Sequence, residues 1–294
     1  MPDGNATTEH YRWLAIQDRG VRVSLSDRTA SIELPPESEL WRGLLLGTDP
    51  AVVKLRRRHR RIPSPPRCKM CAAPFGPPGG WVLRYFGHAR WAKNPKYCEG
   101  CFRTLQANHG GAEVECSLLF ADVRGSTTLA EGMRPAAFRA LMGRFYDEAF
   151  AALIDFNAIV DKFVGDEVIG IFIPAYSGLD HARHALDAAL RLLEVTGHGR
   201  DEGPWIPVGI GVHSGVAFVG SVGQGPDTEL TAMGDPVNVA ARLAGAAGPG
   251  EILITADAAT TAGGVAGREH RSLQLKGKSS PTDVVVVTAA PGDR

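Results

Sequence analysis

The segment Asp161-Lys-Phe-Val-Gly-Asp-Glu167 connects two apolar stretches, 158–164 and 168–173. Two β-strands joined by so short a turn form a hairpin, and Gly165 supplies the backbone freedom that the turn requires. Asp166 then lies at the tip of the hairpin, with its carboxylate facing out of the sheet. Because Gly and Asp are common in turns of any protein, this segment alone indicates a strand pair and no particular chemistry.

A second stretch upstream adds a carboxylate at another strand end. In Cys116-Ser-Leu-Leu-Phe-Ala-Asp-Val-Arg-Gly-Ser-Thr127, the apolar run 118–121 ends at Asp122, and a helical pattern follows. Backbone N–H groups at such a helix start suit a phosphate, and an Asp beside them suits a hard cation bound to that phosphate. Asp122 and Asp166 at two strand ends therefore indicate a two-metal phosphoryl-transfer site.

Five motifs share one order along the chain. They are Phe120-Ala-Asp-Val-Arg-Gly-Ser-Thr127, Lys162-Phe-Val-Gly-Asp-Glu167, Gly211-Val-His-Ser-Gly215, Met233-Gly-Asp-Pro-Val-Asn-Val-Ala-Ala-Arg242 and Leu275-Lys-Gly-Lys278. Together they resemble the catalytic domain of class III adenylyl and guanylyl cyclases, over roughly residues 113–287. The resemblance implies an α/β fold of the α+β, ferredoxin-like type.

Two local expectations concern the elements of this domain. Residues 208–213 and 216–222 are predicted as two strands joined at Ser214-Gly215. Residues 181–195 repeat apolar side chains at helical spacing and predict an amphipathic helix, with His181 and His184 on its solvated face.

The resemblance implies an adenylyl cyclase, which converts ATP to 3′,5′-cyclic AMP and pyrophosphate when the ribose 3′-hydroxyl attacks the α-phosphate. Two Mg²⁺ or Mn²⁺ ions are implied for each active site, with Asp122, Asp166 and the carbonyl group of Val123 as ligands. In their ordinary structural roles, the two carboxylates would instead be a turn residue and a helix-cap residue.

Base recognition is assigned, by the same resemblance, to Lys162 and Thr231. Family members that bind guanine carry Glu at the first position. Lys offers only donors and suits an acceptor nitrogen of adenine, whereas Thr can accept a hydrogen bond from the exocyclic amine. The prediction is therefore ATP, although Thr can also donate. A cyclase for GTP or a pyrimidine triphosphate, and a catalytically silent nucleotide-binding regulatory domain, remain alternatives.

The resemblance assigns three further residues to the reacting nucleotide: Asn238 orients the ribose, Arg242 stabilises the reacting phosphate and Lys276 binds the terminal phosphates. One departure is Gly209, at a position where some members carry an Arg, and Arg124 is a candidate to supply the missing phosphate contact. In this family the metal ligands come from one subunit and the base, Asn and Arg residues from the other. The chain carries both sets, which implies a head-to-tail homodimer with two equivalent sites.

Four cysteines form two pairs outside the cyclase-like region. Cys68-Lys-Met-Cys71 and Cys98-Glu-Gly-Cys101 are separated by 26 residues, a pattern that indicates a four-thiolate metal site. Structural zinc is the first interpretation, an iron–sulfur cluster the second and free thiols the third. Cys116 is interpreted as a small core residue.

Charge and composition suggest how the chain is divided. Residues 1–110 carry 18 Lys and Arg and 9 Asp and Glu, whereas the whole chain of 294 residues has no net charge. We predict an N-terminal region and linker over 1–66 with no assigned function, a zinc-ribbon-like module over 67–110 and a catalytic domain over 111–290.

The run Lys54-Leu-Arg-Arg-Arg-His-Arg-Arg61 is strongly basic. It could bind nucleic acid or anionic lipid, but a solvated helix end is the favoured interpretation, so a nucleic-acid partner is not expected. The sequence has no apolar run of about 18 residues and no secretory signal, which predicts a cytoplasmic protein without a membrane span.

Overall fold

An eight-stranded sheet forms the centre of the computed structural model, which describes residues 37–92, 94–107, 110–222, 229–263 and 269–289. All of these residues belong to the unit Pro36–Arg294. The strand order is β4-β5-β3-β6-β8-β10-β9, and β7 pairs with β6. The bounds are β3 Gly110–Val123, β4 Ile159–Val164, β5 Glu167–Phe172, β6 Val208–Val222, β7 Glu229–Met233, β8 Glu251–Thr255, β9 Glu269–Leu273 and β10 Thr282–Thr288.

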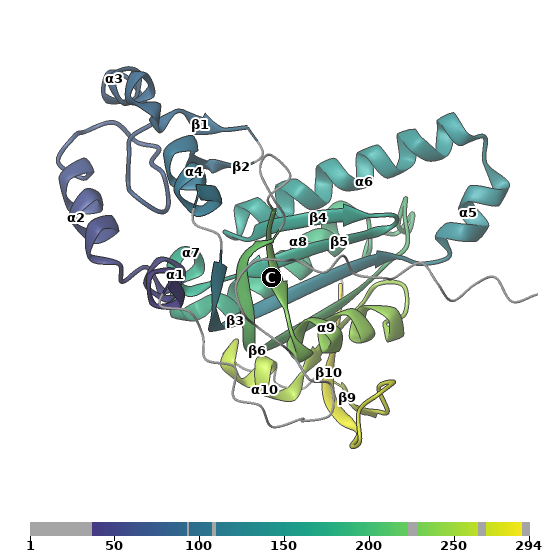
Figure 1. Cartoon of the computed structure of the whole chain (residues 1–294). Helices are drawn as coiled ribbons and strands as arrows, with labels where there is room; N and C mark the ends of the chain where they lie inside the picture. The colour runs from purple at the N-terminus through teal and green to yellow at the C-terminus, as the bar shows by residue number, and fades with distance from the viewer. Residues whose placement is uncertain (1–36, 93, 108–109, 223–228, 264–268, 290–294) are drawn as a thin grey trace, which may run out of the picture. The chain divides into compact units, whose positions relative to one another are not determined.

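The long strand β3 shows why this sheet is covered on both faces (Figure 1). Successive side chains of a strand point to opposite faces. Leu119 and Ala121 join one hydrophobic cluster, whereas Leu118 and Phe120 join another. The apolar run 118–121 is therefore continuous because both of its faces are buried.

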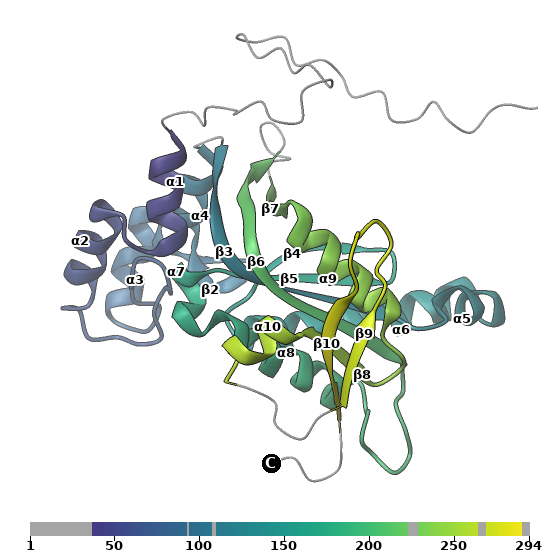
Figure 2. The ribbon, with the colours of Figure 1, turned by 90° about the horizontal axis from the view of Figure 1, so that it is seen from below.

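Different helices cover the two faces. The first cluster contains residues of α6 (Pro135–Asp155), α8 (His181–Val195) and α10 (Ala256–Thr261). The second contains residues of α1 (Glu37–Leu46) and α9 (Asp235–Ala246). Figure 2 shows α1 lying beside β3. Helices on a mixed, largely antiparallel sheet confirm the predicted α+β fold.

The cysteine-containing segment is built from short elements. They are α2 (Pro50–His59), α3 (Gly79–Leu83), a π-helix labelled η1 (Arg84–His88), β1 (Arg90–Trp91), β2 (Asn94–Cys98) and α4 (Glu99–Ala107). Strands β1 and β2 pair as a separate two-stranded sheet. The remaining helices of the described residues are α5 (Ser126–Gly132), α7 (Pro174–Ser177) and the 3₁₀-helix η2 (Gly178–Asp180).

This segment packs directly on the eight-stranded sheet. Its four paired cysteines belong to the same hydrophobic cluster as Leu118 and Phe120. The ring centroids of Tyr97 and Tyr176 are 4.3 Å apart, which joins β2 to α7. Folding of the cysteine segment is therefore coupled to burial of one face of the sheet.

The prediction of two strands joined at Ser214-Gly215 is wrong, because β6 runs without a break from Val208 to Val222. Every residue of β3 pairs with β6 in an unbroken register, including Ser117 opposite Ser214 and Cys116 opposite Gly215. The Oγ atoms of Ser117 and Ser214 are 2.6 Å apart and share a hydrogen bond. Pairing with the long strand β3 thus keeps the turn-like sequence Ser214-Gly215 in an extended conformation.

Among the helices of the described residues, none has both the length and the apolar character that crossing a membrane requires.

Candidate active site and four-cysteine centre

The two carboxylates predicted to bind metal lie at adjacent strand ends. Asp122 is near the end of β3, and Asp166 is in the turn between β4 and β5. Asp122 pairs with Glu167 in the β3–β5 ladder, so the turn places Asp166 beside the end of β3. The N–H group of Val123 donates to the carbonyl oxygen of Asp166 over 3.1 Å. Negative charge gathers here: burial raises the pKa of Glu167, and the Asp166 carboxylate raises it further.

Two hydroxyl groups hold the turn that carries Asp166. Gly165 has φ +62°, a conformation that favours glycine. The hydroxyl of Tyr146, on α6, donates to the carbonyl oxygen of Gly165. The hydroxyl of Ser126, at the start of α5, donates to Oδ2 of Asp166. The Ser of the motif at 120–127 therefore orients a carboxylate from the motif at 162–167.

The side chain of Arg124 contacts Asp122, one of the predicted metal ligands. Its Nη2 forms an ion pair with Oδ1 of Asp122, and its Nη1 donates to the carbonyl oxygen of Gly245 over 3.0 Å. Burial lowers the pKa of Arg124, while Asp166 and Glu167 act in the opposite direction. The guanidinium group thus occupies the position of a counter-ion to these carboxylates.

A cleft of about 870 Å³ opens next to Asp166. Helices α5 and α6 form its walls, through Thr127, Phe138, Met142 and Tyr146 among others. Its volume is within the range of small-molecule sites. None of the described residues lining it is Thr231, Asn238, Arg242 or Lys276.

The predicted base-recognition positions come together on neighbouring strands. Strand β4, which carries Lys162, contacts strand β7, which carries Thr231. The side chain of Lys162 lies outside the described residues. The buried hydroxyl of Thr231 donates to Oδ2 of Asp161 over 2.7 Å. The proton of this hydroxyl is therefore already used, and its oxygen remains available as an acceptor.

Arg242, on α9, lies close to the loop that carries Lys276. Asn238 and Arg242 are four residues apart on this helix and share one face. A Cβ atom at Gly277, next to Lys276, would lie 3.4 Å from Nη2 of Arg242, so the loop passes close to this guanidinium group. Lys278 anchors the same loop through an ion pair with Asp235.

The absence of an arginine at Gly209 has a steric reason. A Cβ atom there would lie 2.7 Å from the carbonyl oxygen of Ala247. Because that oxygen belongs to the backbone just after α9, it could not move without shifting the chain. Position 209 therefore contributes close packing of α9 on β6 in this protein.

The four paired cysteines converge in a buried cluster. The Sγ atoms of Cys68, Cys71, Cys98 and Cys101 all lie within 4.8 Å of one another. The distance is 3.9 Å between Cys68 and Cys101 and 3.6 Å between Cys71 and Cys98. Tetrahedral zinc with bonds of about 2.3 Å separates its sulfurs by about 3.8 Å. The cluster therefore fits one tetrahedral ion. A four-iron cluster places irons and sulfides between its thiolates and needs a wider cage.

Two histidines and a backbone group support the cysteine cluster. Nδ1 of His88 is 3.3 Å from Sγ of Cys98, and the N–H group of Cys98 donates to Sγ of Cys68 over 3.3 Å. His59 lies edge-on to His88 and contacts the carbonyl oxygen of Cys71 through Nδ1, over 2.9 Å. Such contacts orient ligands and offset thiolate charge.

Sequence reasoning missed several of these contacts. No motif assigns a role to Asp161 or Tyr146, which contact residues of the candidate active site. The same is true of His88, which contacts the four-cysteine cluster. For Asp161, its position directly before Lys162 was a signal that the sequence offered. Contacts of Tyr146 and His88 depend on how distant elements pack, which local sequence does not encode. Cys116 is buried and does not belong to the four-cysteine cluster, which agrees with its interpretation as a core residue.

Comparison with known proteins identifies a family. Residues 111–287 match the model of the adenylate and guanylate cyclase catalytic domain. Adenylate cyclase 1 of Rhizobium meliloti is 32% identical over 150 residues, which cover 48% of this chain and 23% of that protein. The adenylate cyclase of Anabaena cylindrica is 32% identical over 145 residues, covering 44% and 26%. The chain thus spans about a quarter of the length of these two relatives.

Solved structures share the fold. The guanylyl cyclase Cya2 aligns with a TM-score of 0.55 and 24% identity, over 63% of this chain and 96% of that one. The adenylyl cyclase CyaB from P. aeruginosa aligns with a TM-score of 0.53 and 24% identity, over 63% and 98%. The two structural neighbours differ in the nucleotide that their names specify, so the fold alone leaves the base open.

Proposed function

Because this chain belongs to the adenylate and guanylate cyclase catalytic domain family, we propose that it is an adenylyl cyclase that forms 3′,5′-cyclic AMP and pyrophosphate from ATP. The observation that carries the choice of ATP is the hydrogen bond from Thr231 to Asp161, 2.7 Å long. With its proton directed to Asp161, Thr231 presents an acceptor lone pair. The exocyclic amine of adenine donates to an acceptor, whereas the carbonyl group of guanine at the same position requires a donor.

Asp122 and Asp166 would hold two divalent cations, Mg²⁺ or Mn²⁺, with the carbonyl group of Val123 as a further ligand. Hard cations prefer such oxygen ligands, and the accumulation of carboxylates beside Glu167 supports this assignment. Bound cations would lower the pKa of the ribose hydroxyl and offset phosphate charge. Ser126 orients Asp166 for this role, and Arg124 must release Asp122 before a cation binds there.

The chain's own residues would then position the nucleotide for in-line attack. The ribose 3′-oxygen forms a bond to the α-phosphorus, the bond to the bridging oxygen breaks, and pyrophosphate leaves. Asn238 holds the ribose, Arg242 neutralises charge that develops on the α-phosphate, and Lys276 binds the terminal phosphates. Lys162, on the strand next to Thr231, completes the base contacts.

The active site would form between two copies of the chain. The cleft beside Asp166 is lined, among the described residues, by α5 and α6 and not by α9 or β7. A second copy in a twofold arrangement would bring its α9 and β7 to this cleft, and the symmetry would create two equivalent sites. A single copy would then be inactive.

The four-cysteine cluster would hold one structural Zn²⁺. Thiolates at tetrahedral spacing support this assignment, with His88 as a supporting contact. Since all four ligands are cysteines and buried, no open position remains for a substrate. The ion would brace the segment that packs against β3.

A nucleotide panel tests the proposed function. The full chain is assayed with ATP, GTP, CTP and UTP, each with Mg²⁺ or Mn²⁺, beside Asp166→Ala. Cyclic AMP as the dominant product, abolished in Asp166→Ala, is the expected result. Dominant cyclic GTP or a cyclic pyrimidine nucleotide would contradict the choice of ATP. No product from any nucleotide, in protein shown to be dimeric, would contradict the cyclase activity and favour a regulatory nucleotide-binding role.

A further inference from the structure

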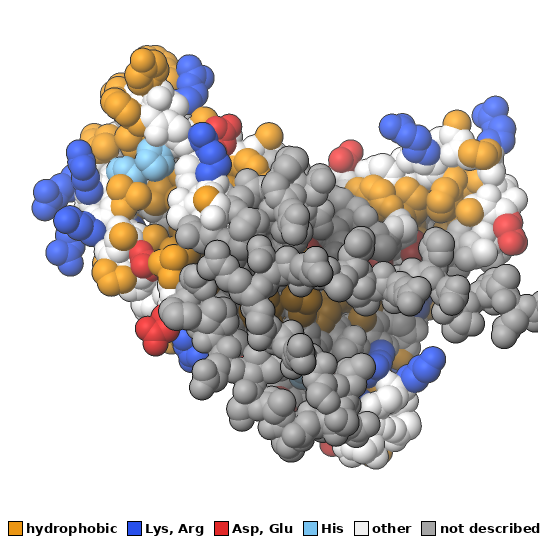
Figure 3. Space-filling view, in the orientation of Figure 1, with side chains coloured by type: hydrophobic (Ala, Val, Ile, Leu, Met, Phe, Trp, Pro, Cys, Tyr) orange, Lys and Arg blue, Asp and Glu red, His pale blue; other side chains and the backbone are white. Residues whose placement is uncertain are grey.

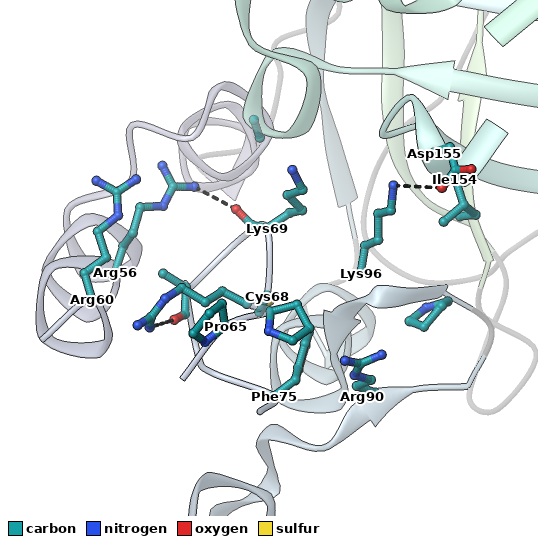
Figure 4. A pocket seen from close by; sticks show the side chains of 15 residues that line it. Arg56, Arg60, Pro65, Cys68, Lys69, Phe75, Arg90, Lys96, Ile154 and Asp155 are labelled. Atoms are coloured by element: carbon teal, nitrogen blue, oxygen red, sulfur yellow. Dashed lines mark hydrogen bonds and ion pairs between the residues drawn. The ribbon is translucent and has the colours of Figure 1, made fainter. Parts of the chain in front are cut away.

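A second cavity lies between α2, the following part of the cysteine segment and the C-terminal end of α6. Its volume is about 740 Å³. Among the residues that the structure describes, one carboxylate, that of Asp155, and six cationic side chains line it: Arg56, Arg60, Arg67, Lys69, Arg90 and Lys96. Figure 4 shows Arg56, Arg60, Lys69, Arg90 and Lys96 around the cavity. We call it the basic pocket.

The cations of the basic pocket come from separate parts of the fold. Arg56 and Arg60 are four residues apart on α2 and therefore share a helix face. Lys69 follows the metal-cluster residue Cys68, and Lys96 lies on β2. Lysines and arginines also cover the outside of α2 (Figure 3). Folding of the cysteine segment thus collects positive charge that the sequence distributes over some forty residues.

Most of this charge has no acidic partner. Asp155 is paired with Lys96 over 3.4 Å. Among the residues that the structure describes, Arg60, Lys69 and Arg90 form no ion pair. Cations gathered in this way repel one another, and a bound anion would remove that cost.

Other contacts make the pocket rigid. Nε of Arg56 donates to the carbonyl oxygen of Met70 over 3.0 Å. Nη1 of Arg67 donates to the carbonyl oxygens of His59 and Ala72 over 2.9 and 3.1 Å. Two guanidinium groups are therefore held in place before any ligand arrives, which lowers the entropy cost of binding.

The rest of the lining is apolar. Pro65, Phe75 and Ile154 contribute carbon surface, and the guanidinium group of Arg90 lies 5.1 Å from the centre of the Phe75 ring. A volume of this size suits a small molecule and is too confined for a nucleic-acid duplex. Concentrated positive charge beside apolar surface suits a compact ligand with several phosphate groups.

We propose that the basic pocket binds a small polyphosphate-bearing anion, with Arg60 and Lys69 as the principal contacts. This site is separate from the cyclase cleft, although α6 reaches both. Met142 and Tyr146 line the cleft, whereas Ile154 and Asp155 line the basic pocket. The ligand would be a free polyphosphate or a nucleoside polyphosphate, which share the recognised group.

Titration calorimetry with inorganic tripolyphosphate tests this proposal. The full chain carries Asp166→Ala, and no divalent cation is added, so that binding at the cyclase cleft is suppressed. Arg60→Gln/Lys69→Gln removes two pocket cations. Arg57→Gln/Arg58→Gln is the matched control, since both arginines are exposed on α2 and do not line the pocket. Zinc content and melting temperature establish that all variants are folded.

Saturable binding of one tripolyphosphate per chain is the expected result. The pocket variant should bind roughly tenfold or more weakly, because two charge-assisted contacts are lost, and the control should bind like its parent. Tighter binding of ATP than of tripolyphosphate would identify a nucleotide as the ligand, and equal binding would identify free polyphosphate. Absence of saturable binding, or an equal loss in both variants, would overturn the proposal.

Discussion

The hydroxyl of Thr231 donates a hydrogen bond to the Asp161 carboxylate over 2.7 Å, from β7 to the residue that precedes Lys162 on β4. This contact joins the two strands that carry the predicted base-recognition positions. It also fixes the direction of the hydroxyl proton, which decides whether Thr231 can accept or donate. We therefore expect nucleotide preference to depend on Asp161 as well as on Thr231.

Removing the hydroxyl should reduce use of ATP selectively. In Thr231→Val, the adenine amine loses its acceptor, and kcat/KM for ATP should fall about tenfold, the value of one hydrogen bond near 1.4 kcal/mol. In Asp161→Ala, the freed hydroxyl can donate, so the ratio of ATP to GTP turnover should fall. Steady-state kinetics with both nucleotides measure this ratio. The buried Thr255, bound to His213 on another strand, provides the matched control Thr255→Val, whose ratio should stay unchanged. An unchanged ratio in both site variants would show that Thr231 does not contact the base.

Arg124 should compete with cations for Asp122. Its guanidinium group forms an ion pair with Asp122. Arg124→Gln should therefore tighten binding of Mn²⁺ to the nucleotide-free protein by roughly fivefold. This factor corresponds to about 1 kcal/mol for the loss of a partly exposed ion pair. Electron paramagnetic resonance of free Mn²⁺ measures this directly. Arg139, exposed in the same cleft, supplies the control Arg139→Gln. Weaker Mn²⁺ binding in Arg124→Gln would contradict competition and favour a phosphate-binding role.

The four-cysteine cluster should contain one zinc ion per chain. Metal analysis of the purified protein should show one equivalent of zinc and no visible absorption from iron. Cys101→Ala should lose the ion and melt at a markedly lower temperature, because the cluster shares its hydrophobic surroundings with β3. Cys116→Ala, at a buried cysteine outside the cluster, should keep its zinc. Iron in place of zinc, or full zinc content in Cys101→Ala, would contradict this assignment.

Acidification should destabilise the domain through its buried histidines. Burial lowers the pKa of His198 and of His181 from 6.5. A lowered folded-state pKa means that the unfolded chain binds the proton more readily, so stability is present above about pH 6.5 and is lost as pH falls towards the folded-state value. His198→Gln should therefore lose less melting temperature than wild type between about pH 7.5 and 5.5. The exposed His270 provides the control His270→Gln, which should follow wild type. An equal pH dependence in all three proteins would contradict the prediction.

Local sequence was sufficient for elements whose signal lies within a few residues. The predicted helix 181–195 coincides with α8, and the hairpin around Gly165 forms as expected. The solvated position of His181 was wrong, because its ring is buried with Nδ1 2.8 Å from Oγ of Ser117. That contact joins residues 64 positions apart, beyond the reach of a helical repeat.

The candidate site divides in the same way. The positions of Asp122, near the end of β3, and of Asp166, in the turn between β4 and β5, could be predicted because each follows an apolar run beside a recognisable turn; their role as metal ligands stays a prediction. The motif at 211–215 was misread as a break, since pairing with β3 decides its conformation. The basic run 54–61 does lie at the exposed C-terminal end of α2. However, Arg56 and Arg60 also line a cavity whose other walls come from distant segments. Neither spacing nor composition reveals such a cavity before the chain is folded.

The most direct measurement of the proposed shared active site mixes two inactive variants. Asp166→Ala removes a proposed metal ligand, and Arg242→Ala removes the proposed contact to the reacting phosphate, so each variant alone should lose about a hundredfold or more of its turnover. Mixed in equal amounts after subunit exchange, half of the dimers carry one intact site, and cyclic AMP formation should recover to about a quarter of the wild-type rate. No recovery, in a mixture shown to contain heterodimers, would contradict a site built from two chains.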